Sequence, residues 1–159
     1  MSEYYNAVVC TNGHVLSRYH EPGEKVDNFC QQCGGKTILS CSNCGTAIRG
    51  HAVDGIITLS AKPPKPPAYC PVCGNPYPWT EKASLALIQT LREEDELETK
   101  VIDNIERSLP DVISETPATG LAAARFRKAL LAVGTFTAEA AKDFIVNFGC
   151  EAIKNILGV

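Results

Sequence analysis

The chain has 159 residues, a formal net charge of −3 at pH 7, 45% hydrophobic residues and 21% charged residues. This length accommodates one domain or two small ones, and the excess of acidic over basic side chains argues against a function that depends mainly on contacts to nucleic-acid phosphates. No apolar run approaches the roughly 20 residues of a membrane-spanning helix, so no membrane span is expected.

The composition changes near residue 79. Residues 1–79 contain seven of the eight cysteines, eight of the ten prolines and eight of the twelve glycines, whereas residues 80–159 are rich in Ala, Leu, Ile and Glu. The first half has too few large apolar side chains for a stable core of its own, and bound metal can supply the missing folding free energy. We therefore expect two domains, residues 1–79 and residues 80–159.

The first half contains four pairs of potential metal ligands, one of the form Cys-x-x-x-His and three of the form Cys-x-x-Cys. These pairs are Cys10 with His14, Cys30 with Cys33, Cys41 with Cys44, and Cys70 with Cys73. Two cysteines with two residues between them lie across a tight turn, so both sulfurs can reach one ion. A glycine, which suits a turn that ends with positive φ, follows each Cys-x-x-Cys pair. Eight ligands at this spacing predict two structural zinc sites.

Three assignments of the ligand pairs to the two ions are possible. The sequential assignment joins the first pair to the second and the third to the fourth. The nested assignment joins the two middle pairs, and the cross-braced assignment joins the first to the third and the second to the fourth. Only seven residues separate Cys33 from Cys41, which leaves little room for a hairpin between them. We therefore favour the sequential assignment and keep the other two as alternatives.

Disulfide bonds are the competing explanation for eight cysteines. The start of the chain, MSEYYNAVVC, has neither the basic n-region nor the apolar h-region of a signal peptide. We therefore expect a reducing, cytoplasmic location, in which metal binding is the more usual role of paired cysteines. Cys150 stands apart and is expected to be a small buried apolar residue. His20 and His51 have no partner at metal-ligand spacing and are not expected to be ligands.

Short antiparallel strands are predicted between the ligand pairs, at residues 7–9, 15–19, 37–39 and 56–59. Asp54 and Gly55 form a dipeptide typical of a hairpin turn. The segment of residues 62–67 has four prolines in its last five positions, which favours an extended polyproline conformation. We interpret it as a stiff spacer that leads to Cys70, with a docking segment for an aromatic-lined groove as the alternative.

The second half is predicted to form about four helices. Pro78 should end the preceding regular structure, Thr80 is the expected N-cap, and Trp79 is expected to pack the first half against the first helix. Apolar periodicity places helices near residues 85–91, 97–109 and 121–133, and a fourth from residue 137 to residue 156. Pro110 and residues 115–120 are expected to separate the second helix from the third.

Several motifs together resemble those of a family of uncharacterised bacterial proteins with a double zinc ribbon. They are Cys10-Thr-Asn-Gly-His14, Phe29-Cys30-Gln-Gln-Cys33-Gly34, Cys41-Ser-Asn-Cys44, Ile48-Arg49-Gly50, Tyr69-Cys70-Pro-Val-Cys73-Gly74 and Pro78-Trp79-Thr80. Residues 122–126 and 140–156 of the helical tail are similar as well. The resemblance implies a bacterial source, two zinc ions held by the eight ligands named above, and no assigned reaction.

The expected fold is α+β, an N-terminal double zinc ribbon of short hairpins followed by a helical region. Each site has four protein ligands and lacks the open position of a catalytic zinc, and the sequence has no Gly-rich phosphate loop and no His-Glu-x-x-His motif. We therefore expect a non-enzymatic protein-interaction or adaptor module with a protein partner. The alternative is a nucleic-acid-binding zinc-ribbon protein, for which Arg49, Lys62 and Lys65 could form a local patch although the net charge does not favour it.

Overall fold

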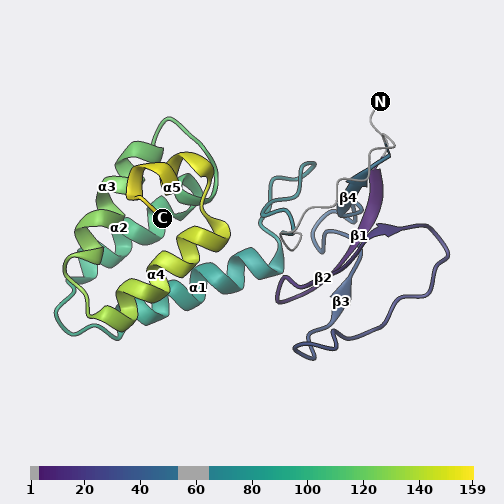
Figure 1. Cartoon of the computed structure of the whole chain (residues 1–159), viewed down its shortest axis with the longest axis horizontal. Helices are drawn as coiled ribbons and strands as arrows, with labels where there is room; N and C mark the ends of the chain where they lie inside the picture. Colours follow the sequence, from purple (N-terminus) through teal and green to yellow (C-terminus); the bar gives the residue numbers. More distant parts are fainter. Residues whose placement is uncertain (1–3, 54–64) are drawn as a thin grey trace. The chain divides into compact units, whose positions relative to one another are not determined.

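The computed structural model describes residues 4–53 and 65–159, which form strands followed by helices (Figure 1). The strands are β1 (Tyr4–Cys10), β2 (Val15–His20), β3 (Thr37–Ile38) and β4 (Arg49–Ala52). The helices are α1 (Pro78–Arg92), α2 (Thr99–Ile113), α3 (Thr119–Leu130), α4 (Thr135–Phe148) and α5 (Glu151–Leu157). The expected α+β class is confirmed. The chain separates into two compact units, Met1–Glu81 and Lys82–Val159.

Strand β1 is the centre of the sheet in the first unit and pairs antiparallel with β2, β3 and β4. Val9 lies opposite Val15 of β2 and Ile38 of β3. Because neighbours cover β1 at both edges, its second half is buried, with Val8 and Val9 at 2% and 0% exposure. The strands expected at residues 7–9, 15–19 and 37–39 are found here.

Strand β4 was not predicted, because its sequence, Arg49-Gly50-His51-Ala52, has no alternation of apolar and polar residues. The strand forms where the backbone of Gly50 can lie very close to the backbone of Arg18. A Cβ atom at Gly50 would overlap the carbonyl oxygen of Arg18, so only glycine fits there. The strand expected at residues 56–59 and the turn at Asp54 and Gly55 lie outside the described residues.

The first turn of α1 differs from the prediction. The helix begins at Pro78, whose fixed φ and missing N–H suit the first helical position. Thr80 is not the N-cap. Its hydroxyl donates instead to the carbonyl oxygen of Ala68 (2.9 Å), and Thr80 is 1% exposed. The residue that sequence alone assigned to a helix cap therefore ties the start of α1 to the chain before it.

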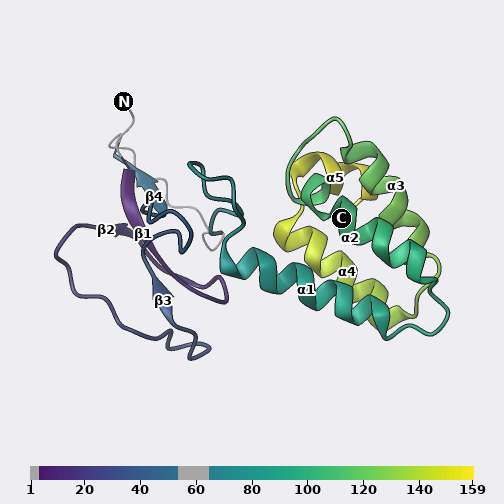
Figure 2. The same cartoon turned by 180° about the vertical axis from the view of Figure 1, so that it is seen from behind.

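The helical unit has an apolar interior to which every helix contributes. Helix α2 packs on α3 and α4, and α5 packs on α3 and α4 (Figure 2). Ile105, Phe126, Ile145 and Ile153 are fully or almost fully buried, and Leu91 of α1 lies beside Ile105 and Phe126. Within the described residues, the structure contains no helix of the length and apolar character needed to cross a bilayer.

Two helix boundaries differ from those expected. The predicted fourth helix is two helices, α4 and α5, because the chain bends at Gly149, where a Cβ atom would press on the Ile145 carbonyl and on Ile153. Pro110 does not end α2 but lies inside it. The Pro110 carbonyl still accepts the Ser114 N–H (2.9 Å), and the helix turn that follows buries Val112. Because Pro110 lies near the C-terminal end of α2, its missing N–H removes one backbone hydrogen bond but does not end the helix.

Candidate metal centres

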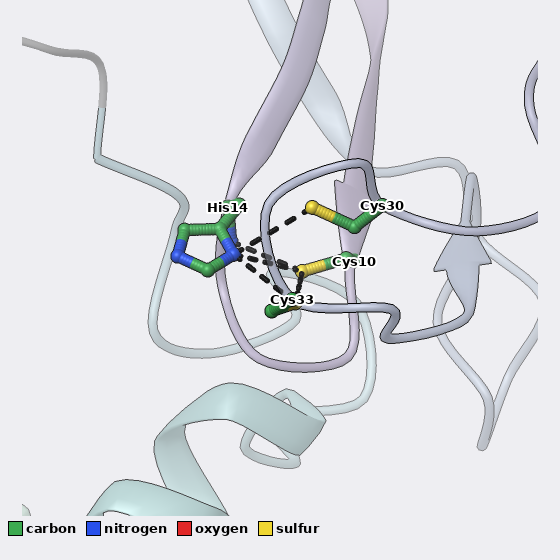
Figure 3. Close-up of side chains that lie close together, drawn as sticks. All are labelled: Cys10, His14, Cys30 and Cys33. Carbon is green, nitrogen blue, oxygen red and sulfur yellow. Dashed lines mark hydrogen bonds between the residues drawn. The ribbon is translucent and has the colours of Figure 1, made fainter.

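The first ligand cluster gathers Cys10, His14, Cys30 and Cys33 (Figure 3). Cys10 ends β1, His14 directly precedes β2, and the other two come from the segment that leads to β3. The four ligand atoms lie within 4.8 Å of one another. The Nδ1 atom of His14 faces the sulfurs, at 3.3 Å from Cys33, 3.5 Å from Cys10 and 3.7 Å from Cys30. If this cluster holds an ion, Nδ1 is therefore the nitrogen that binds it.

The second cluster gathers Cys41, Cys44, Cys70 and Cys73, again within 4.8 Å. The sulfurs of Cys41 and Cys73 are 3.7 Å apart, and those of Cys44 and Cys70 are 3.6 Å apart. The side chains are thus grouped as in the sequential assignment. Neither the nested nor the cross-braced grouping occurs among these eight residues.

The spacing of the ligand atoms fits a shared tetrahedral ion. Zinc bound to sulfur at about 2.3 Å holds the sulfurs of a tetrahedron about 3.8 Å apart, close to the separations in both clusters. A disulfide would need about 2.05 Å, and all eight cysteines of the chain are free. Both clusters can therefore hold a metal ion, with three sulfurs and one nitrogen in the first and four sulfurs in the second.

Each of the three Cys-x-x-Cys pairs lies in its own ten-residue hairpin, and the three hairpins have the same backbone hydrogen bonds. In the first hairpin, Cys30 donates its N–H to Gly35, Gly34 donates to Cys30, and Thr37 donates to Asn28. The same three bonds recur in the other two hairpins. They are Cys41 to Thr46, Gly45 to Cys41 and Ile48 to Leu39, then Cys70 to Asn75, Gly74 to Cys70 and Tyr77 to Ala68.

The repeated hairpin explains two features of its sequence. Gly34, Gly45 and Gly74 have φ of 68°, 75° and 72°, which side chains other than glycine rarely adopt. The seventh residue after each first cysteine is buried, and these residues are Thr37, Ile48 and Tyr77. The prediction of the ligand pairs used the cysteines and the glycine but missed this buried position, which the spacing between the three copies could have revealed.

The thiols of the first cluster have unequal acidity. The side-chain amide of Asn12 donates to Cys33 Sγ (3.3 Å), as does the backbone N–H of Gly35 (3.4 Å). These two bonds, the Asn12 bond first, lower the pKa of Cys33 from 9.0 to about 6. Burial raises the pKa of Cys10. Asn12 was not singled out from the sequence, although it lies between the ligands Cys10 and His14.

The second cluster has a corresponding donor. A hydrogen bond from the Asn75 backbone is the main cause that lowers the pKa of Cys73 from 9.0 to about 6. The side-chain amide of Asn75 also lies 3.6 Å from the Cys73 sulfur. Each cluster thus contains one exposed or half-exposed thiol that is a thiolate near neutral pH, the form that binds metal.

A stacked aromatic pair lies between the ligand hairpins of the first unit and the start of α1. The rings of Tyr77 and Trp79 stack with centroids 4.7 Å apart, and both residues are buried. Trp79 Nε1 donates to the carbonyl oxygen of Pro67 (2.8 Å). Gly13, next to His14, has φ of 92°, and a Cβ atom there would lie 3.0 Å from Trp79 Cβ. Trp79 thus packs on the turn that carries the first cluster.

The remaining candidates from the sequence have other surroundings. Nδ1 of His20, which is 8% exposed, lies 3.4 Å from a carboxylate oxygen of Glu24, and the ring of His51 lies 5.1 Å from that of Tyr19. Neither histidine belongs to a ligand cluster in the ranges that the structure describes. Cys150 is half-exposed at the start of α5, so the prediction that it is buried is wrong.

The geometry defines a class first: an α+β protein with two four-ligand clusters, each able to hold a metal ion. The sequence then defines the family. The model of a family described as "Uncharacterized protein conserved in bacteria (DUF2321)" matches residues 3–157. The chain belongs to this family, which agrees with the resemblance noted from its motifs. Comparison with curated proteins and with solved structures gives no significant match.

Proposed function

We propose that this protein binds two zinc ions as structural elements and serves as a non-enzymatic protein-interaction or adaptor module. The observation that carries the proposal is that each cluster supplies four protein ligand atoms at the separations of a tetrahedron. A catalytic zinc keeps one position for water or substrate. Four protein ligands fill all the coordination positions of a tetrahedral ion, so the ion would stabilise the fold and would not bind substrate.

Zinc is the proposed metal because of the ligand types. Three thiolates with one imidazole are a usual zinc set, whereas four thiolates suit zinc or iron. The second cluster uses two copies of the hairpin that also supplies Cys30 and Cys33 to the first cluster, which supports the same metal in both. The reducing cytoplasm of a bacterium would keep the ligand thiols free for binding.

Metal analysis tests this part of the proposal. Protein purified under reducing conditions and without added metal should contain two zinc ions per chain by elemental analysis. Cys150→Ser is the control and should keep both, because Cys150 is outside both clusters. One zinc and one iron per chain would contradict zinc at the four-thiolate cluster, and a chain purified without metal that gains none on titration would contradict the whole proposal.

A group of partly exposed aromatic residues on the sheet, Tyr5, Tyr19 and His51, supports an interaction role. The ring of Tyr19 lies 5.7 Å from that of Tyr5 and 5.1 Å from that of His51. The guanidinium of Arg49 lies over the ring of Tyr4 at 5.1 Å. Tyr4 and Tyr19 are 43% and 46% exposed. Tyrosine and arginine are the residues that most often contribute strongly to protein interfaces.

Affinity purification from a bacterium that encodes this protein tests the interaction role. A partner that binds the aromatic group should be recovered with the native chain and lost with Tyr19→Ala. Phe136→Ala is the matched control, because Phe136 is an exposed aromatic residue of the helical unit and its loss should leave recovery unchanged. Equal recovery with Tyr19→Ala would remove the sheet as the docking surface.

Binding of single-stranded nucleic acid is the second candidate, because the same aromatic rings could stack on bases. The charge gives it less support, since residues 1–79 carry six Lys or Arg against five Asp or Glu. Lys62 of the possible basic patch lies outside the described residues. Fluorescence anisotropy with labelled oligonucleotides at low salt distinguishes the two candidates. Binding that weakens with added salt and with Tyr19→Ala would support the second, and no binding would remove it.

A further inference from the structure

The two cysteines of each hairpin differ in exposure. The first cysteine is buried in all three hairpins, whereas the second faces solvent, since Cys33 and Cys44 are exposed and Cys73 is half-exposed. A competing proton or chelator reaches a bound ion through the ligands that face solvent. Retention of the ion should therefore depend on the hydrogen bonds that these three sulfurs accept.

In two hairpins, the residue two positions after the solvent-facing cysteine brings a polar side chain to its sulfur. The hydroxyl oxygen of Thr46 lies 3.2 Å from Cys44 Sγ. The side-chain amide nitrogen of Asn75 lies 3.6 Å from Cys73 Sγ. A hydroxyl can donate or accept, but a sulfur bound to metal is a thiolate and has no hydrogen to donate. With an ion bound, Thr46 is therefore the donor to Cys44.

The first hairpin has a glycine, Gly35, at the corresponding position. The side-chain donor comes instead from the turn between β1 and β2, where the amide nitrogen of Asn12 lies 3.3 Å from Cys33 Sγ. A Cβ atom at Gly35 would lie 3.0 Å from that nitrogen and 3.2 Å from the sulfur. A side chain at position 35 would thus compete with Asn12 for the same space, and glycine leaves this space to the amide.

We propose that Asn12, Thr46 and Asn75 are positioning residues of the metal sites, each donating a side-chain hydrogen bond to the solvent-facing thiolate of one hairpin and so slowing loss of the ion. This inference rests on the proposed function, because it requires bound metal. Asn12 acts on the first site and Thr46 on the second. The side chain of Asn75 contributes least, because its contact with sulfur is the longest of the three.

Zinc transfer from the full chain to a coloured chelator tests the role of Thr46. Cys73→Ala disables the second cluster and so identifies the phase that belongs to the first. Thr46→Val keeps the shape of this half-exposed side chain and removes its hydroxyl. We expect it to speed the second phase by about 10-fold, the lower end of the loss usual when the partner of a metal ligand is removed, and to leave the first phase unchanged.

Two further variants separate the hydroxyl from the rest of the side chain. Thr46→Ser keeps a hydroxyl and should release both ions at the native rate. Thr90→Val removes a hydroxyl that donates to the Ala86 carbonyl oxygen within α1. It is the matched control in the helical unit and should also leave both phases unchanged.

The first site allows the donor to be moved to another position. Asn12→Ala should speed the first phase by about 10-fold. Adding Gly35→Asn places an amide where the third hairpin has Asn75, in the space that the Asn12 side chain has left, and should restore slow release. Gly35 does not have a positive φ, so another residue can adopt its backbone conformation. A double variant as fast as Asn12→Ala alone would contradict the equivalence of the two positions.

A spectroscopic measurement separates a lost hydrogen bond from a loss of packing. In cobalt-substituted protein, Thr46→Val should shift the sulfur-to-cobalt charge-transfer absorption of the second site, because the electron density on the Cys44 sulfur changes. Thr46→Ser should keep the native band. A packing defect alone would lower the stability of the zinc protein to denaturant without moving this band.

Two results would overturn the inference. They are native release rates and native cobalt spectra in both Thr46→Val and Asn12→Ala, or equal acceleration by Thr46→Val and Thr46→Ser. Either result would leave the proposed function intact, because both ions would still be bound. A native chain that binds no metal would instead overturn the proposed function and the inference together.

Discussion

At the scale of the residue, the thiolate of Cys33 depends on a side chain that is not a ligand. The Asn12 amide and the Gly35 N–H hold the pKa of Cys33 at about 6 instead of 9.0. A group with a lowered pKa stays charged as the pH falls and is protonated only below that lowered value. The first site should therefore lose its metal as the pH falls, because protons compete with the metal for the thiolates.

Replacing Asn12 with Ala should make the first site release zinc at a higher pH. Loss of this donor raises the pKa of Cys33, so protons compete earlier, and we expect a shift of about half a pH unit. Zinc release during acid titration should show two transitions, of which Asn12→Ala moves one. Asn75→Ala keeps the backbone N–H that is the main cause of the lowered Cys73 pKa, so it should move the other transition little. Two unchanged transitions in Asn12→Ala would show that the Gly35 bond alone maintains the thiolate.

Gly13 illustrates a different requirement, for backbone conformation and space together. It has φ of 92° and lies against Trp79, whereas Gly23 has φ of 98° and open space around it. Gly23→Ala should cost about 1–2 kcal/mol from backbone strain alone. Gly13→Ala should cost about 1–3 kcal/mol more, because its methyl group also presses on Trp79.

Denaturant unfolding of the zinc-loaded variants measures this difference, and equal costs would show that Trp79 moves aside without penalty.

At the scale of the element, the ten-residue hairpin is the unit from which the metal sites are built. One hairpin combines with the Cys10–His14 turn, and two hairpins combine with each other. Each cluster joins two ligand pairs that follow each other in the sequence, and no ligand is shared between the clusters.

Double variants test this grouping by the number of ions lost. His14→Ala with Cys33→Ala removes two ligands of one cluster and should release one zinc. His14→Ala with Cys73→Ala removes one ligand from each cluster and should release both. Elemental analysis after gel filtration gives the two stoichiometries. Two ions lost from the first double variant would mean that the clusters are not independent.

The predictable elements are those whose signal lies in local spacing. The ligand pairs and their glycines predict the hairpins, and the apolar periodicity of α2 predicts that helix. Strand β4 could not be predicted, because it depends on how closely Gly50 approaches the Arg18 carbonyl, a contact between distant residues. The close approach of Gly149 to Ile145 and Ile153, where α4 ends, is likewise visible only in the folded structure.

The same distinction applies to the candidate sites. The eight ligand residues are visible from spacing, but the donor Asn12 is not. Its role depends on the direction in which the fold turns an ordinary polar side chain. The burial of Tyr77 follows from its place in the hairpin, whereas its unpaired hydroxyl is evident only in three dimensions.

At the scale of the whole molecule, the two units differ in what stabilises them. The first unit has few large buried side chains besides Ile48, Tyr77 and Trp79, whereas the helical unit has a continuous apolar interior. Metal should therefore supply much of the folding free energy of the first unit and none of that of the second.

Chelation should separate the two units. A strong chelator at neutral pH should unfold the strands and hairpins, while α2 to α5 keep most of the far-ultraviolet helical signal. Thermal scans with and without the chelator should then share one transition, that of the helical unit. Loss of the helical signal together with the metal would show that these helices need the first unit for their burial.

The fluorescence of Trp79 should report whether metal is bound to the first unit. Trp79 is the only tryptophan in the chain, and it is buried against Gly13 and Tyr77 within the unit that contains both ligand clusters. Its fluorescence should therefore shift to longer wavelength when the ions are removed and return when zinc is restored. The helical unit contains no tryptophan that could obscure the change, so metal occupancy can be read in solution from the unlabelled protein.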